Sequence, residues 1–132
     1  MGHLVLVVED HPFVRRAVRD TLIAQGLSVV TAESVSVANR LMLARDAHFS
    51  ILVTDVNLPD GTGWSVARKA RHIWPQLLVL YMSAEEQRDF DEQAVTLSAL
   101  VPKPFESSEL MRALACLGLS AEAGPAPALQ EA

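Results

Sequence analysis

Residues 51–61 read ILVTDVNLPDG, and this stretch decides the fold that we predict. It opens with apolar and β-branched residues, as a buried strand does, and it delivers Asp55 at the carboxyl end of that strand. The Pro-Asp-Gly segment at residues 59–61 is typical of a turn, so we expect a loop over residues 58–63. Three further apolar runs end beside a carboxylate, hydroxyl or ammonium side chain: residues 4–8 before Glu9 and Asp10, residues 77–82 before Ser83, and residues 100–101 before Lys103.

Strand and helix patterns alternate along the whole chain. We expect strands over residues 4–8, 28–31, 50–54, 77–82 and 98–101, and helices over residues 12–26, 36–45, 64–72, 85–95 and 106–117. The strand patterns are nearly continuous in apolar residues, which indicates a parallel sheet covered by helices on both faces. Right-handed crossovers leave few topologies, so we predict an α/β fold of the flavodoxin-like (βα)5 class, doubly wound, with strand order 2-1-3-4-5.

The length and composition limit the classes of protein to which the chain can belong. A chain of 132 residues fits one domain, which we expect to span residues 1–118. Ala, Pro, Gly and Glu dominate the end of the chain, so residues 119–132 are predicted to be a disordered tail or a linker remnant. No run approaches the ~20 apolar residues of a membrane span, and we expect a cytoplasmic protein without membrane insertion. The single cysteine, Cys116, lies in a helical apolar pattern, which predicts a buried thiol.

The charge of the chain indicates protein partners. A net charge of −5 disfavours direct nucleic-acid binding, because phosphate contacts need clustered Lys and Arg. Arg15, Arg16 and Arg19 do form a basic cluster near the first predicted helix. We expect this cluster to be a solvated helix face, and the alternative is a docking surface for an acidic partner.

The predicted fold brings the polar residues at the strand ends together, because ligands of open parallel sheets bind outside the carboxyl ends of the strands. Three carboxylates, those of Glu9, Asp10 and Asp55, would repel one another there and need a cation. Mg²⁺ suits oxygen ligands and commonly bridges carboxylates to a phosphate. The Lys103 ammonium would neutralise a phosphoryl oxygen, and the ionised Asp55 would be an acceptable nucleophile.

Four sequence blocks over residues 4–117 resemble the motifs of the response-regulator receiver domain of two-component signalling. The blocks are VEDHP at residues 8–12, TDVNLPDG at residues 54–61, MSA at residues 82–84 and KPF at residues 103–105. Each block alone is weak, but their joint order and spacing make a chance match very improbable. The resemblance implies that Asp55 accepts a phosphoryl group from a phosphohistidine of a sensor histidine kinase or a histidine phosphotransfer protein.

The resemblance also implies the roles of the surrounding residues. Asp10 and Asp55 would supply carboxylate oxygens to Mg²⁺ and Asn57 its backbone carbonyl, while Glu9 would act directly or through water. Lys103 and the Ser83 hydroxyl would bind phosphoryl oxygens, and the Lys103-Pro104 bond is expected to be cis, as in the family.

Two other positions bear on phosphoryl access and lifetime. Small Ala84 would leave the phosphoryl group accessible to donor and water. Asn57 and Glu85 match the residue types of the chemotaxis response regulator, so the acyl phosphate is expected to be short-lived.

The chain departs from the family pattern at Leu100, where a switch aromatic is usual, and Pro102 directly before the lysine is also uncommon. Leucine fills space without presenting a ring, so the resemblance supports phosphorylation better than the standard output switch. We therefore expect a receiver that signals to an unknown downstream protein and is not a dedicated enzyme. The alternatives are a phosphorelay intermediate or the receiver of a hybrid kinase, a phosphorylation-independent adaptor, and a phosphatase of the haloacid dehalogenase type. That last class needs an acid at the position of Asn57.

Overall fold

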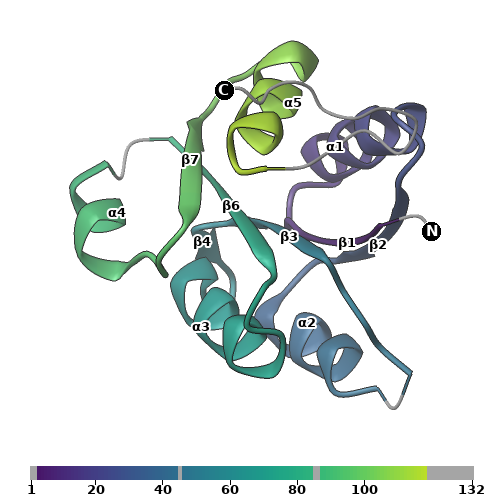
Figure 1. Cartoon of the computed structure of the whole chain (residues 1–132). Coiled ribbons are helices and arrows are strands. Elements are labelled where there is room, and N and C mark those ends of the chain that lie inside the picture. The colour runs from purple at the N-terminus through teal and green to yellow at the C-terminus, as the bar shows by residue number, and fades with distance from the viewer. Residues whose placement is uncertain (1–2, 45, 85–86, 119–132) are drawn as a thin grey trace.

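The computed structural model describes residues 3–44, 46–84 and 87–118, which fold around one five-stranded sheet (Figure 1). The strands of this sheet are β1 (Leu4–Val8), β2 (Ser28–Ala32), β3 (Ile51–Asp55), β6 (Leu78–Ser83) and β7 (Ser98–Pro102). Every neighbouring pair is parallel, and the order across the sheet is β2-β1-β3-β6-β7. Counted along the chain, this is the predicted flavodoxin-like order 2-1-3-4-5, so the predicted fold class is confirmed.

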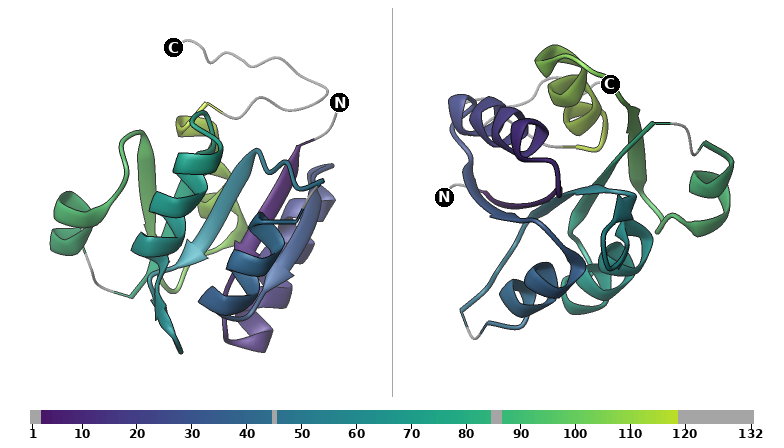
Figure 2. Two further views of the ribbon diagram at one scale, coloured as in Figure 1. Left: turned by 90° about the horizontal axis from the view of Figure 1, so that it is seen from below. Right: turned by 180° about the vertical axis from the view of Figure 1, so that it is seen from behind.

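Helices cover both faces of the sheet. They are α1 (Pro12–Ala24), α2 (Val35–Met42), α3 (Gly63–Ile73), α4 (Gln87–Gln93) and α5 (Ser107–Cys116). Helices α1 and α5 lie side by side on one face, while α2, α3 and α4 lie on the other (Figures 1 and 2). This doubly wound arrangement explains why the strands read as continuous apolar runs, since both of their faces are buried.

A separate hydrophobic core lies on each face of the sheet. Along β1, Val5 and Val7 join the core under α1 and α5, whereas Leu6 and Val8 join the core under α2 and α3. The alternation follows from the two-residue period of a strand. Apolar residues of the helices fill the same cores: Leu22 in α1 is fully buried, as are Leu110 and Leu114 in α5. Burial of each such leucine contributes roughly 1.5–3 kcal/mol.

Local sequence signals set the helix starts. Pro12 is the first residue of α1, where its missing N–H costs nothing. Ser34 caps α2, because its hydroxyl accepts a hydrogen bond from the Val37 N–H at 3.1 Å. Helix α5 begins with a reciprocal capping box between Glu106 and Glu109. These caps fix the turns that lead out of the strands and into the helices.

The structure differs from the sequence prediction after Asp55. Residues 58–63 were expected to form a plain loop, but residues 57–62 form a small antiparallel hairpin of β4 (Asn57–Leu58) and β5 (Gly61–Thr62). Helix α3 then begins at Gly63, one residue earlier than expected. Helix α2 ends at Met42, short of the predicted residue 45, and the described part of the predicted 85–95 helix spans Gln87–Gln93.

The predicted burial of Cys116 is wrong, because its side chain is exposed. Leu114 faces the core, and a residue two positions later in a helix points about 200° away from it. No helix within the described ranges is long and apolar enough to cross a membrane. The predicted tail at residues 119–132 lies outside the described residues.

Candidate functional site

The candidate site lies at the carboxyl ends of the parallel strands. Asp55 is the last residue of β3 and Ser83 the last of β6, while Glu9 directly follows β1 and Lys103 directly follows β7. The ammonium nitrogen of Lys103 lies 2.8 Å from Glu9 Oε1 and 3.1 Å from Asp55 Oδ2. One lysine therefore joins two carboxylates that come from different strands, and the predicted convergence is confirmed for these three residues.

Burial makes the charges of this site interact strongly. Glu9 is fully buried, Asp55 is 9% exposed and Lys103 is half-buried. Burial raises the pKa of the Glu9 carboxyl, and the negative charge of Asp55 adds to that rise, against hydrogen bonds from Lys103 and the His11 N–H. Burial alone would lower the pKa of Lys103, but its hydrogen bond to Glu9 and the charges of both carboxylates outweigh burial and raise it. The lysine is therefore a fixed cation at neutral pH.

The carboxylates also fit a divalent cation. Glu9, Asp10 and Asp55 each offer an oxygen atom, and these atoms lie within 4.8 Å of one another. Asp10 is exposed, so a cation bound here would keep contact with solvent. A hard ion that binds carboxylates and retains several waters, such as Mg²⁺, matches this set of ligands. Asn57, whose backbone carbonyl was predicted as a further ligand, begins β4 two residues after Asp55 and is exposed.

Arg15 holds the loop that carries two of these carboxylates. Its Nη1 donates hydrogen bonds to the backbone oxygens of Glu9 at 3.0 Å and of Asp10 at 3.3 Å. Arg15 is half-buried and so combines this loop contact with exposure to solvent, whereas Arg16 is exposed as expected and Arg19 pairs with neighbouring Asp20. Arg15 lies in the first turn of α1, and that position could have suggested a contact back to the preceding loop.

The backbone behind Asp55 is packed too closely for a side chain at Gly63. A Cβ atom at Gly63 would lie 2.1 Å from the Asp55 carbonyl oxygen. The Gly63 N–H donates to the Val56 carbonyl at 2.7 Å, and the Thr54 hydroxyl donates to the Asp55 carbonyl at 2.9 Å. Sequence reasoning placed Gly63 in a loop and missed this role, which fixes the backbone of the central carboxylate.

The neighbouring strand ends complete the site. Ser83 is buried, and its backbone carbonyl accepts a hydrogen bond from the Lys103 N–H at 2.7 Å. The Lys103-Pro104 bond is cis, as the family resemblance implied. Ala84 follows Ser83 and is exposed, which leaves an open approach beside the lysine. Glu85, predicted to influence phosphoryl lifetime, lies outside the described residues.

An aromatic side chain occupies the strand beside Leu100. Tyr81 pairs with Leu100 across β6 and β7, is fully buried, and shares its core with half-buried Leu100. Its ring centroid lies 4.6 Å from that of Trp64 and 6.1 Å from that of Phe90. Its hydroxyl accepts a hydrogen bond from the Val95 N–H at 3.2 Å. The corner between α4 and β7 is therefore anchored by an aromatic residue from the adjacent strand.

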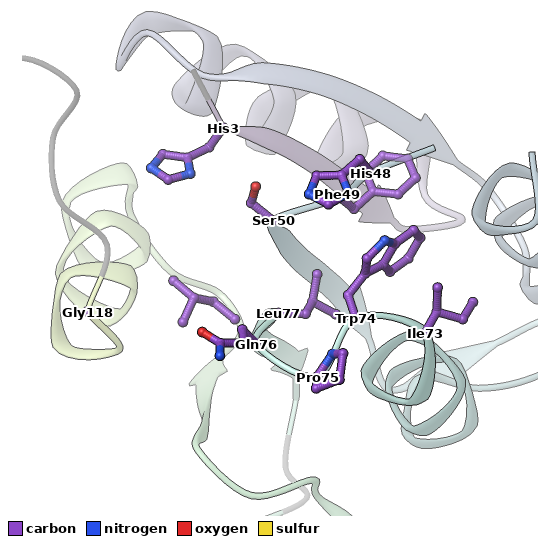
Figure 3. Close-up of a pocket in the computed structure, with 11 residues that line it drawn as sticks. His3, His48, Phe49, Ser50, Ile73, Trp74, Pro75, Gln76, Leu77 and Gly118 are labelled. Atoms are coloured by element: carbon purple, nitrogen blue, oxygen red, sulfur yellow. The ribbon is translucent and has the colours of Figure 1, made fainter. Parts of the chain in front are cut away.

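Two of the hollows in the described part of the chain reach opposite ends of the sheet. A groove of about 550 Å³ between α1 and α5 extends to Lys103 and Ala84 and is lined by the apolar side chains of Phe13, Val14 and Phe105. A second hollow of about 580 Å³ lies at the amino ends of the strands, lined by Phe49, Trp74, Leu77 and other residues (Figure 3). Only the first hollow adjoins the carboxylate site.

Comparisons with known proteins agree with this geometry. Residues 5–115 match the family model of the response regulator receiver domain. The chain is 37% identical over 132 residues to the response regulator protein FleR of Pseudomonas aeruginosa, covering 95% of this chain and 28% of that protein. It is 25% identical over 116 residues to the chemotaxis protein CheY of Bacillus subtilis, covering 86% of this chain and 96% of that one.

A solved structure shares the same arrangement. The crystal structure of a response regulator receiver protein from Sinorhizobium medicae WSM419 superposes with a TM-score of 0.82 at 27% identity, covering 88% of this chain and 94% of that one. The family match extends from β1 through almost all of α5 and therefore includes all the strand ends that form the carboxylate and lysine cluster. The chain belongs to the response regulator receiver domain family.

Proposed function

We propose that this chain accepts a phosphoryl group from a partner phosphohistidine onto Asp55, with Mg²⁺ bound beside it, and signals by protein contact. The observation that carries the proposal is the position of Lys103, whose ammonium contacts Asp55 and Glu9 next to a cluster of cation-binding oxygens. A nucleophile, a fixed positive charge and a metal-binding cluster are the parts that phosphoryl transfer to a carboxylate requires.

In the proposed transfer, an Asp55 carboxylate oxygen attacks the phosphorus atom, so that a P–O bond forms and the P–N bond to the donor imidazole breaks. The departing nitrogen keeps the electron pair, and the ring leaves neutral when its other nitrogen carries a proton. Lys103 neutralises a phosphoryl oxygen, and the Ser83 hydroxyl donates to another. Later attack by water on phosphorus releases inorganic phosphate and restores the Asp55 carboxylate.

Glu9, Asp10, Asp55 and the Asn57 carbonyl are the groups that we assign to Mg²⁺. The ion would supply positive charge for the phosphoryl oxygens and offset the repulsion between the carboxylates. The residues fit this role because three carboxylate oxygens already lie within 4.8 Å of one another and Asp10 is open to solvent.

The groove between α1 and α5 is the surface that we assign to the phosphohistidine donor. Phe13 on its rim is 77% exposed, and Lys103 and Ala84 lie at its end. An apolar helix seated in this groove would bring a histidine on its surface to the open side of Asp55. A helical histidine-bearing domain of a sensor kinase or phosphotransfer protein therefore suits the groove.

We consider two possible fates of the signal: transfer of the phosphoryl group to another protein, and contact with a downstream protein. Leu100 lacks the ring expected of the standard switch, which favours a relay intermediate that passes the phosphoryl group to another histidine protein. Contact with a downstream protein is the first proposal, because the α4 to β7 corner still carries a buried aromatic at Tyr81. A haloacid dehalogenase phosphatase is disfavoured by the family match and by Asn57. The intact Asp55 and Lys103 argue against a phosphorylation-independent adaptor.

Mass spectrometry after treatment with acetyl phosphate and Mg²⁺ tests this proposal. The wild-type chain should gain one phosphoryl group, and Asp55→Asn should gain none. Asp20→Asn serves as the matched control, because Asp20 is an exposed acid on α1 that contacts neighbouring Arg19. Equal labelling of Asp55→Asn and wild type would falsify the assignment of Asp55.

A further inference from the structure

A hairpin carries Asn57 away from Asp55 and touches α2 with its turn. The register of β4 and β5 pairs Asn57 with Thr62, so Pro59 and Asp60 form the turn. The Asp60 carboxylate accepts two backbone hydrogen bonds from the start of α2: Oδ1 from the Val35 N–H at 2.8 Å, and Oδ2 from the Ser36 N–H at 2.9 Å. Both carboxylate oxygens thus bind the start of a helix that precedes Asp60 by 24 to 25 positions in the chain.

The same part of the hairpin also packs against α2. A Cβ atom at Gly61 would lie 3.1 Å from a methyl carbon of Val35, and Gly61 has φ near +158°, at the edge of the region that favours glycine. At its base the hairpin is tied to the sheet, since the Val56 N–H donates to the Met82 carbonyl at 3.1 Å and its carbonyl accepts from Gly63. The hairpin is therefore held at both ends.

From these contacts we infer that Asp60 is a positioning residue for the magnesium site. It holds the hairpin against α2 and so fixes where the Asn57 carbonyl points. The inference rests on the proposed function, because it concerns the same metal site. A ligand carbonyl in an unsupported loop would have to be ordered when the ion binds, and that ordering would weaken binding.

The contact is more than an ordinary helix cap. Helix α2 already has its own cap, the Ser34 hydroxyl, which accepts from Val37. Asp60 adds a carboxylate from a distant segment at the positive end of the helix dipole, where negative charge is favourable. The two bonds lower the pKa of the Asp60 carboxyl. Asp60 lies three residues after Asn57, and through these two bonds its negative charge stabilises the start of α2.

Magnesium binding to the wild-type chain and three variants tests the inference without any phosphodonor. Amide NMR titration with MgCl₂ gives the dissociation constant, and thermal melting without Mg²⁺ gives the stability of each chain. Asp60→Ala should raise the dissociation constant about tenfold, the lower end of the effect of groups that orient metal ligands. Ser34→Ala is the matched control, because it weakens the same helix start and leaves the hairpin contact intact. Asp60→Asn keeps an acceptor oxygen and should restore part of the affinity.

The outcomes separate positioning from helix stability. A weaker Mg²⁺ affinity in Asp60→Ala, with unchanged affinity in an equally destabilised Ser34→Ala, supports the inference. Unchanged affinity in Asp60→Ala overturns it, as does equal weakening in Ser34→Ala or a wild-type chain that binds no Mg²⁺. A wild-type chain that binds Mg²⁺ but is not labelled by acetyl phosphate would refute the phosphoacceptor role and leave the positioning role to be decided by the affinities.

Discussion

Lys103 lies closer to Glu9 than to Asp55, with its nitrogen 2.8 Å from Glu9 Oε1 and 3.1 Å from Asp55 Oδ2. Glu9 is also the more deeply buried of the two carboxylates. The lysine would therefore keep a partner if Asp55 were phosphorylated as proposed. Its ammonium has three donor hydrogens, so it can contact a new phosphoryl oxygen while keeping its bond to Glu9.

We expect Lys103→Met to separate phosphoryl transfer from metal binding. The substitution removes the charge that neutralises a phosphoryl oxygen, so labelling by acetyl phosphate at saturating Mg²⁺ should slow by about tenfold or more, which is ~1.4 kcal/mol in the barrier. Mg²⁺ affinity should not fall, because a competing cation has left the carboxylates. Timed mass spectrometry and calorimetric Mg²⁺ titration measure the two effects. Lys69→Met, at an exposed position of α3, is the control, and a parallel loss of Mg²⁺ affinity would contradict the assigned role.

Phe13→Glu should affect transfer from a protein donor only. The side chain is 77% exposed on the groove that extends to Lys103, and a buried aromatic contact is commonly worth more than 1 kcal/mol in an interface. Transfer from a phosphohistidine protein should slow about tenfold, while labelling by acetyl phosphate stays at the wild-type rate. Ile23→Glu is matched to it, since Ile23 is 50% exposed on the same helix and does not line the groove. Equal slowing by both substitutions would argue for a general charge effect.

Tyr81→Phe should loosen the corner between α4 and β7 without changing phosphorylation. The variant keeps the ring beside Trp64 and Phe90 and removes the oxygen that accepts from the Val95 N–H. Loss of this hydrogen bond should lower the free energy of unfolding by about 1 kcal/mol. Hydrogen exchange should show faster exchange at the Val95 amide, with the labelling rate of Asp55 preserved. Unchanged protection of that amide would mean that the phenol does not anchor the corner.

The stability conferred by Asp60 should depend on pH. Its contacts with the Val35 and Ser36 N–H groups lower the pKa of the carboxyl in the folded chain, so near the ordinary value of 3.8 the folded state binds fewer protons than the unfolded state. The stabilisation is therefore present above that value and is lost as the pH falls through the folded-state pKa. Urea unfolding in the presence of a chelator should show a gap between wild type and Asp60→Asn that is widest near neutral pH and narrows in acid. The loss of unfolding free energy in Ser34→Ala should not show this pH dependence, since a serine cap does not titrate.

The sequence was sufficient to predict the strands and the residues at their carboxyl ends. Asp55 and Lys103 are separated by 48 positions, yet a parallel sheet places both at one edge because each lies at the carboxyl end of a strand. The prediction needed only the period of the apolar pattern and the handedness of the crossovers. The start of α1 at Pro12 could likewise be predicted from the sequence.

Contacts between elements could not be predicted in the same way. The Asp60 contact depends on where the start of α2 lies relative to a turn, and the Tyr81 contact on how α4 packs against β6. These features follow from three-dimensional packing, on which a single sequence gives no direct information.

The hollow at the amino ends of the strands has a practical consequence. His3 and Gly118 both line it (Figure 3), so the first and last described residues lie at the same end of the sheet, and Asp55 lies at the carboxyl end of β3. A short peptide joining these ends would permit circular permutation, with new termini placed in a surface loop. A dye attached at residue 3 or residue 118 would likewise lie at the end of the sheet opposite to the carboxylate site.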